Sequence, residues 1–152
     1  MSDDAIGPVR LRAAGSDDLG AVRELLNASH LITDGLEDQF GPAYVVADCA
    51  GRVVGAEGIE RYERAGLLRS AVVDERFRGR GLGDELTRDR LAWARTEGLE
   101  EVWLLTTTAS EFFPRFGFAA ADRAAAPSAL QQSVEFREAC PASAVAMRLR
   151  LT

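Results

Sequence analysis

The stretch with the clearest chemical meaning is RGRGLG at residues 78–83, which follows an apolar segment and precedes a helical pattern. Glycines adopt positive φ at little cost and leave their backbone N–H groups open to a ligand. Glycines at the start of a helix therefore predict a turn whose N–H groups bind an anion, aided by the helix dipole. Arg78 and Arg80 can add charge-assisted hydrogen bonds. The pattern predicts a phosphate-binding turn.

Two better-known phosphate motifs do not fit this stretch. A P-loop requires a lysine directly after its last glycine, and all 18 basic residues of this chain are arginines. A dinucleotide-binding turn requires GxGxxG, and counting from Gly79 its last position holds Asp84. The remaining alternative is a glycine-rich turn with solvated arginines.

Two glutamates and an arginine lie on neighbouring predicted strands. Glu57 and Glu60 are three positions apart, so their side chains point to opposite faces of the strand. We favour Glu60 as a general base because it adjoins Tyr62 at the strand end; an exposed carboxylate at a strand terminus is the alternative. Arg69 interrupts the apolar stretch LLRSAVV. A buried arginine requires a partner, which is either Glu60 or an anionic group of a substrate.

Hydroxyl groups follow the next apolar strand, in the stretch TTTASEFF. Ser110, Thr107 and Thr108 are candidate proton donors for chemistry at this strand end. The alternative is that Ser110 caps a helix and the threonines bond to strand-end backbone. The single histidine, His30, fits a surface or capping role better than catalysis.

The hydrophobic pattern predicts the elements that position these residues. The predicted strands are residues 9–13, 44–48, 52–59, 67–73, 102–105, 118–121 and 145–151. The predicted helices are one with Ser16 as N-cap that includes residues 19–26, a short one at 36–40, and three at 81–97, 110–116 and 127–139. Nothing in the pattern indicates a linker or a repeat, so residues 1–152 are predicted to form one α/β domain with a mixed sheet flanked by helices.

Composition argues against several classes of function. The net charge of −6 disfavours nucleic-acid binding. The chain has no apolar run near the ~20 residues that span a bilayer, and its start lacks a signal-peptide pattern, so a cytoplasmic protein is expected. Cys49 and Cys140 lie far apart without CxxC spacing, so we predict neither a metal site nor a disulfide framework.

Residues 78–83 match the (Q/R)xxGx(G/A) pyrophosphate-binding motif, and the strand order resembles the GCN5-related N-acetyltransferase (GNAT) family along nearly the whole chain. The resemblance implies that acetyl-CoA is the acetyl donor and that its pantetheine runs between the strands 67–73 and 102–106. It also implies that the backbone at Val73 holds the acetyl carbonyl. The residues expected to bind the donor are Val72, Val73, Arg78, Gly79, Arg80, Gly81, Leu82, Gly83 and Phe113.

The same resemblance raises a question about the proton donor. In many family members a tyrosine in an AxxFY stretch serves as the acid, and the aligned stretch here, ASEFF, has Phe113 in its place. Because a CoA thiol is acidic enough to leave largely as thiolate, the donor is helpful and not indispensable. The candidate proton donors are therefore Ser110, Thr107, Thr108 and water.

A narrower resemblance rests on LLRSAVV, LLTTTASEFF, RFGF and CPASAVAM. These stretches resemble an acetyltransferase subgroup associated with arsenic-resistance gene clusters, and parts are similar to the acetyltransferase domain of N-acetylglutamate synthases. Both imply an acceptor that is an amino acid or an amino-acid-like compound, organoarsenicals included. Glu60 and Arg69 are then the expected acceptor contacts.

The predicted activity is acetyl transfer to the amine of a small molecule by direct attack in a ternary complex. Cys140 has no histidine near it in the sequence that would activate it as an acyl carrier. The alternative is a non-catalytic acyl-CoA-binding module or sensor. The resemblance to the family and the half-buried strand at 145–151, as an edge for pairing with a second copy, imply a homodimer.

Overall fold

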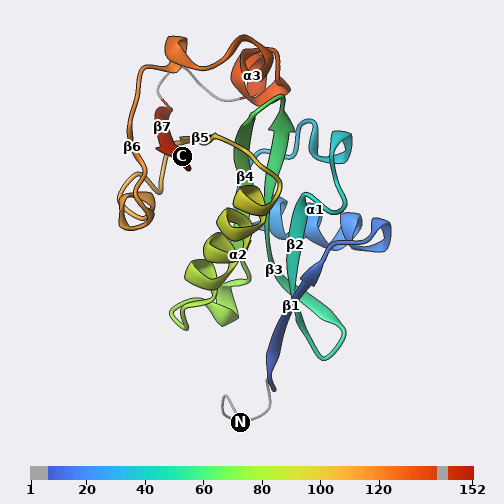
Figure 1. Cartoon of the computed structure of the whole chain (residues 1–152). Helices are drawn as coiled ribbons and strands as arrows, with labels where there is room; N and C mark the ends of the chain where they lie inside the picture. Colours follow the sequence, from blue (N-terminus) through green and yellow to red (C-terminus); the bar gives the residue numbers. More distant parts are fainter. Residues whose placement is uncertain (1–6, 140–143) are drawn as a thin grey trace.

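The computed structural model describes residues 7–139 and 144–152 (Figure 1). The strands are β1 (Val9–Ala13), β2 (Tyr44–Cys49), β3 (Arg52–Tyr62), β4 (Ala65–Val73), β5 (Glu101–Thr106), β6 (Ala119–Ala120) and β7 (Val145–Arg150). The α-helices are α1 (Leu19–Ala28), α2 (Leu82–Thr96) and α3 (Ser128–Gln131). Shorter helical turns are η2 (Ser16–Asp18), η3 (Leu36–Asp38), η4 (Glu75–Phe77), η5 (Phe113–Phe116), η6 (Arg123–Ala125) and the π-helical turn η7 (Glu135–Ala139).

The described strands form one sheet in the order β1-β2-β3-β4-β5-β7-β6. Neighbouring strands are antiparallel except β4 and β5, which are parallel. A parallel pair requires a crossover connection, and α2 supplies it. The predicted α/β fold, a mixed sheet flanked by helices, is confirmed.

The two faces of the sheet are covered by different helices, as Figure 1 shows for α1 and α2. Val22 of α1 packs in one cluster with Val46, whereas Leu86 of α2 packs in another with Val45. Successive strand residues point to opposite faces, so Val45 is buried on one face of β2 and Val46 on the other. This burial explains the continuous apolar runs of the central strands.

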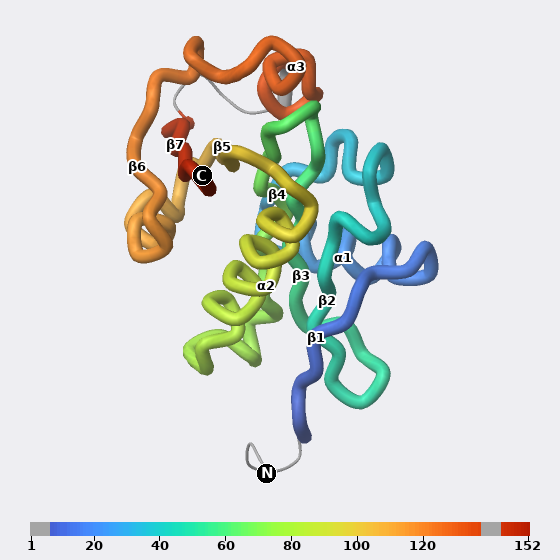
Figure 2. The backbone as a smooth tube through the Cα atoms, in the orientation of Figure 1, coloured from blue at the N-terminus to red at the C-terminus, as the bar shows by residue number. Residues whose placement is uncertain are grey.

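The segment that contains α3 and η7 covers the far end of the sheet. Figure 2 shows α3 beside the turn between β3 and β4, at the end of the molecule away from β1. Leu130 and Phe136 pack there against Trp103 of β5, which is fully buried. This packing places η7 over the same face of the sheet as α1.

The structure differs from the predicted elements at several helix ends. The helix predicted at 127–139 is interrupted, because the Ser133 hydroxyl accepts a hydrogen bond from Phe136 N at 3.3 Å and so acts as an N-cap within the segment. The predicted helix at 110–116 is only the turn η5. Ser16 is not an N-cap: Gly15 has that place before η2, and the Asp18 carboxylate accepts a hydrogen bond from Gly15 N at 2.8 Å.

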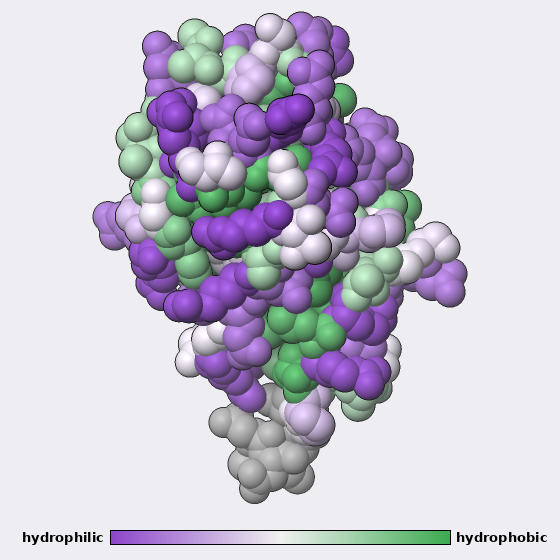
Figure 3. All heavy atoms as spheres, in the orientation of Figure 1, coloured by the Kyte–Doolittle hydropathy of each residue, from purple (hydrophilic) through white to green (hydrophobic). Residues whose placement is uncertain are grey.

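The view in Figure 3 shows a mostly hydrophilic surface with small apolar areas between charged side chains. The large hydrophobic side chains exposed in the described part of the chain are Val9 and Val145. No helix within residues 7–139 or 144–152 is both long and apolar enough to cross a membrane.

Candidate functional site

A cleft of about 1440 Å³ opens between β4 and β5. The two strands pair only over residues 65–67 and 101–103 and then separate. In β4 an extra residue opposite Glu57 forms a bulge, where Ser70 has a φ of 61°. A positive φ is uncommon for a residue other than glycine. The bulge and the separation open a passage through the sheet, with α2 on one side and residues 29–32 and Glu135 on the other.

The glycine-rich turn borders one end of the cleft, at the N-terminus of α2. Gly79 and Gly81 have φ values of 80° and 81°, and a Cβ at either position would meet no other atom within 4 Å. Gly81 is the N-cap residue of α2 and supplies no side-chain cap, so the first N–H groups of the helix are open to a ligand. An anion such as a pyrophosphate therefore fits this turn.

The two arginines of the turn lie differently. Arg78 lines the cleft and donates to Val73 O and to Ser29 Oγ, both at 3.0 Å, so it connects β4 to the end of α1. Arg80 does not line the cleft; its guanidinium lies over the Phe77 ring and donates to Arg76 O at 3.2 Å. Of the other residues expected to bind the donor, Val72, Val73, Leu82 and Gly83 line the cleft.

Phenylalanine rings form the wall of the cleft beyond β5. Phe113 is 5% exposed and its ring packs against those of Phe112 and Phe118, with centroids 5.0 and 5.7 Å away. Thr107 and Ser110 are exposed and line the cleft. Ser110 does not cap η5, whose N-cap is Phe112. The strand-end turn is instead held by Thr106, whose hydroxyl accepts a hydrogen bond from Ala109 N at 2.9 Å.

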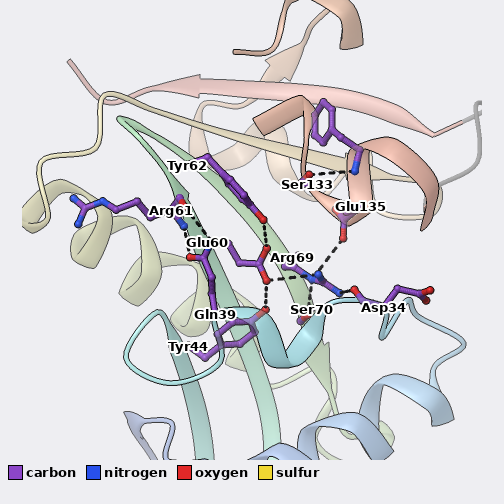
Figure 4. A network of polar contacts seen from close by, with 11 residues as sticks. Asp34, Gln39, Tyr44, Glu60, Arg61, Tyr62, Arg69, Ser70, Ser133 and Glu135 are labelled. Atoms are coloured by element: carbon purple, nitrogen blue, oxygen red, sulfur yellow. Dashed lines mark hydrogen bonds and ion pairs between the residues drawn. The ribbon is translucent and has the colours of Figure 1, made fainter. Parts of the chain in front are cut away.

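A buried polar cluster surrounds Arg69, on the α1 side of the sheet (Figure 4). The Arg69 side chain is 2% exposed, and its nitrogens lie 3.5 Å from Glu60 Oε2 and 3.6 Å from Glu135 Oε1. The guanidinium also donates to Asp34 O at 2.8 Å and to Ser70 Oγ at 3.3 Å. Arg69 therefore has protein partners on each of its nitrogens. It lines the cleft together with Glu135.

Glu60 is held by two tyrosines as well as by Arg69. Tyr44 donates to Glu60 Oε2 at 3.1 Å and Tyr62 donates to Oε1 at 2.9 Å. Burial raises the pKa of Glu60, although Arg69 and both hydroxyls act in the opposite direction. Glu60 is 1% exposed and is not among the residues that line the cleft, so its carboxylate lies behind Arg69 and not at the cleft surface.

Glu57 faces the opposite side of the sheet, toward α2. Its Oε1 accepts a hydrogen bond from Thr87 Oγ1 at 2.9 Å, while its buried Oε2 has no hydrogen-bond partner within residues 7–139 and 144–152. Burial raises the pKa of Glu57 to about 8. The prediction that Glu57 and Glu60 point to opposite faces is confirmed.

Glu135, Ser29 and Ser70 border the cleft and were not singled out from the sequence. Glu135 follows the break at Ser133, and a charged residue between two apolar ones, Val134 and Phe136, was the available signal. His30 is exposed and lines the cleft. Cys140 lies outside the described residues. Among those residues no cluster of three or more His, Cys, Asp or Glu side chains could hold a metal ion.

Comparison with known proteins gives a match to the model of the acetyltransferase (GNAT) domain over residues 41–120. An uncharacterized N-acetyltransferase of Chlorobaculum tepidum is 38% identical over 76 residues, which are 49% of this chain and 48% of that protein. The chain thus matches about half the length of this curated relative.

Solved structures share the fold at low sequence identity, among them the following two. N-acetylglutamate synthase from Neisseria gonorrhoeae, in complex with coenzyme A and L-arginine, superimposes with a TM-score of 0.79 at 20% identity, covering 95% of this chain and 34% of that one. Rv2747 from Mycobacterium tuberculosis, in complex with CoA and NLQ, gives 0.78 at 22% identity, covering 94% and 99%. The domain match covers more than half of the sequence, including the glycine-rich turn and the strands on both sides of the cleft. This chain belongs to the GNAT acetyltransferase family.

Proposed function

We propose that this protein transfers the acetyl group of acetyl-CoA to the amine of a small molecule by direct attack in a ternary complex. The observation that carries the proposal is a single cleft with an open helix N-terminus at one end and the buried Arg69 cluster at the other. The first can hold the pyrophosphate of the donor, and the second offers charged groups to a polar acceptor. Family membership supports the same activity.

On the donor side, the backbone of residues 78–83 would hold the pyrophosphate. Val72, Val73, Leu82 and Phe113 would lie along the pantetheine. Arg78, already fixed between β4 and the end of α1, lines the cleft and would add its charge to the binding of a phosphate. Arg80 would need to leave Phe77 to do the same. Bound acetyl-CoA would supply the activated acetyl group.

On the acceptor side, we propose an amino acid or an amino-acid-like compound, with organoarsenicals as candidates to be tested. Arg69 is the group that would face an acceptor carboxylate or a similar oxyanion, with Glu60 fixing the guanidinium from behind. The N. gonorrhoeae neighbour is named for synthesis of an acetylated amino acid, which is consistent with this acceptor class. The cytoplasm is the expected compartment. A homodimer stays an expectation, but the strand from which an edge was expected, β7, lies between β5 and β6 and is not an edge strand.

The proton donor for the leaving thiolate is proposed to be Thr107, Ser110 or water, since Phe113 has no hydroxyl. Both hydroxyls are exposed at the cleft, and neither accepts or donates a hydrogen bond within the described residues. They can therefore turn toward a ligand without losing a protein contact.

The proposal is tested by calorimetry with acetyl-CoA, paired with thiol release across the amino acids, simple amines and organoarsenical amines. Acetyl-CoA binding together with thiol release and a mass increase of the acceptor would support it. Binding without release for any amine would favour the acyl-CoA sensor, for which the absence of a tyrosine at Phe113 is the structural argument. Lack of acetyl-CoA binding would refute both functions.

A further inference from the structure

The cluster around Arg69 contains one cation and two carboxylates, so it holds one negative charge in excess when both are ionised. Buried charge is costly unless it is paired. Glu60 shares Arg69 with Glu135 but has two further hydrogen bonds from tyrosines. Glu135 has no such support, which makes it the carboxylate whose pairing is incomplete.

The position of Glu135 sets it apart from Glu60 in a second way. Glu135 lines the cleft and Glu60 does not. The Glu135 carboxylate accepts no hydrogen bond within residues 7–139 and 144–152, and its ion pair with Arg69 Nε is 3.6 Å long, beyond normal hydrogen-bond distance. The carboxylate is thus buried, held by charge alone, and points toward Arg69 (Figure 4), at a position that lines the cleft.

We propose that Glu135 binds the ammonium group of the acceptor and removes its proton before acetyl transfer. The inference rests on the proposed function and adds to it the group that handles the amine. An acceptor ammonium supplies the positive charge that the cluster lacks, so its binding neutralises the excess. An acceptor with both an ammonium and a carboxylate would reach Glu135 from the cleft and place its carboxylate on the Arg69 side, since both residues line the cleft.

The proton balance of the step is simple. One proton passes from the acceptor ammonium to Glu135, which leaves a neutral amine with a free electron pair. The C–N bond then forms while the C–S bond of the thioester breaks, and the electron pair of that bond stays on sulfur. The amine nitrogen loses a second proton, which ends on the thiolate to give the thiol. Glu135 finally releases its proton to water.

The surroundings of Glu135 suit this role. Burial is the main cause that raises the pKa of Glu135 to about 7, Glu60 acts in the same direction, and Arg69 and Arg123 oppose it. A base of this pKa is ionised in much of the protein at neutral pH and still holds a proton well. Arg69 is the positioning residue, since it fixes Glu135 at the cleft wall.

The test compares wild type with Glu135→Gln, Glu135→Asp and the surface control Glu24→Gln, assayed by thiol release with the amino acids and their decarboxylated amines. Glu135→Gln should lose kcat/KM by about 100-fold or more at pH 7 while its calorimetric affinity for acetyl-CoA stays unchanged. Glu135→Asp should recover part of the loss. In wild type kcat/KM should fall as the pH drops below about 7, and Glu135→Gln should lack that limb.

A second readout does not depend on turnover. In protein labelled with carboxyl-¹³C glutamate, one resonance should titrate near pH 7 in wild type and be missing in Glu135→Gln. Methylammonium should lower the apparent pKa of this resonance in wild type. Tetramethylammonium, which has no N–H, should not. The inference would be overturned if methylammonium left the apparent pKa of this resonance unchanged, or if Glu135→Gln were as active as Glu24→Gln. Wild type without thiol release for any amine would instead overturn the proposed function, and the resonance would still decide whether Glu135 binds an ammonium.

Discussion

Arg69 Nε and Glu135 Oε1 lie 3.6 Å apart, and their side chains are 2% and 7% exposed. A buried pair of this kind costs desolvation on both sides, and removal of one partner leaves the other charge without compensation. Arg69 also balances Glu60, so the loss of its charge would leave two buried carboxylates without the cation that pairs with them. The cluster is therefore sensitive to a change at Arg69.

Replacement of Arg69 by Met should lower the free energy of unfolding by about 3–5 kcal/mol at pH 8. The loss should be smaller at pH 5, where the raised pKa values of Glu60 and Glu135 allow both carboxylates to take up protons. Urea unfolding at the two pH values measures both effects. The matched control is Arg64→Met, whose ion pair with Glu100 at 2.9 Å is exposed and should contribute less than about 1 kcal/mol. Equal losses in the two variants would contradict this account.

Replacement of Gly81 by Trp should abolish acetyl-CoA binding in calorimetry. Gly81 and Gly98 have the same φ of 81°, and each lies in open space next to α2, one before the helix and one after it. Gly98→Trp therefore imposes the same left-handed strain, about 1 kcal/mol, without filling the cleft. Both variants should unfold at similar urea concentrations, and only Gly81→Trp should lose the ligand. Retained affinity in Gly81→Trp would refute the assignment of the phosphate-binding turn.

The parts of the structure that the sequence predicted are those decided by local pattern. The turn at 78–83 and the start of α2 follow from glycines beside an amphipathic helix, and the alternation of side chains placed Glu57 and Glu60 on opposite faces. These features depend on residues close in sequence, which is why single-sequence reasoning reaches them.

The Arg69 cluster depends on contacts between distant segments. The register of β2 on β3 pairs Tyr44 with Gly58, where a Cβ would lie 2.4 Å from the tyrosine ring, and this close approach brings the hydroxyl to Glu60. Glu135 contacts Arg69 from the segment that follows the break of the predicted helix 127–139 at Ser133. Periodicity in the sequence contains neither the register nor the break.

Replacement of Glu57 by Gln should make stability less dependent on pH. Burial raises the pKa of Glu57 to about 8 in the folded protein, above its value of about 4.5 in the unfolded chain. The folded state therefore holds the proton more tightly, so this contribution to stability is complete below pH 4.5 and is lost as the pH rises through 8, by up to about 1.4 kcal/mol per unit.

Gln is neutral at every pH and can still accept the hydrogen bond from Thr87. Relative to wild type, Glu57→Gln should gain stability between pH 5 and pH 9, while Glu24→Gln, an exposed substitution on α1, should track wild type. Urea unfolding at three pH values gives the comparison. A constant difference between Glu57→Gln and wild type across the range would show that Glu57 is ionised in the folded protein.

Replacement of Phe113 by Tyr tests whether the wall of the cleft lacks only a hydroxyl. Phe113 lines the cleft, so a para hydroxyl can reach the reacting thioester, and we expect acetyl-CoA affinity to stay unchanged while the transfer rate rises by up to about tenfold. Phe118→Tyr is the matched control, because Phe118 packs against Phe113 in the same core but does not border the cleft. Its hydroxyl would be buried without a partner and should cost about 1–3 kcal/mol of stability with no gain in rate. If Phe113→Tyr also loses stability and leaves the rate unchanged, the side chain points into the core, and the proton reaches the thiolate from Thr107, Ser110 or water alone.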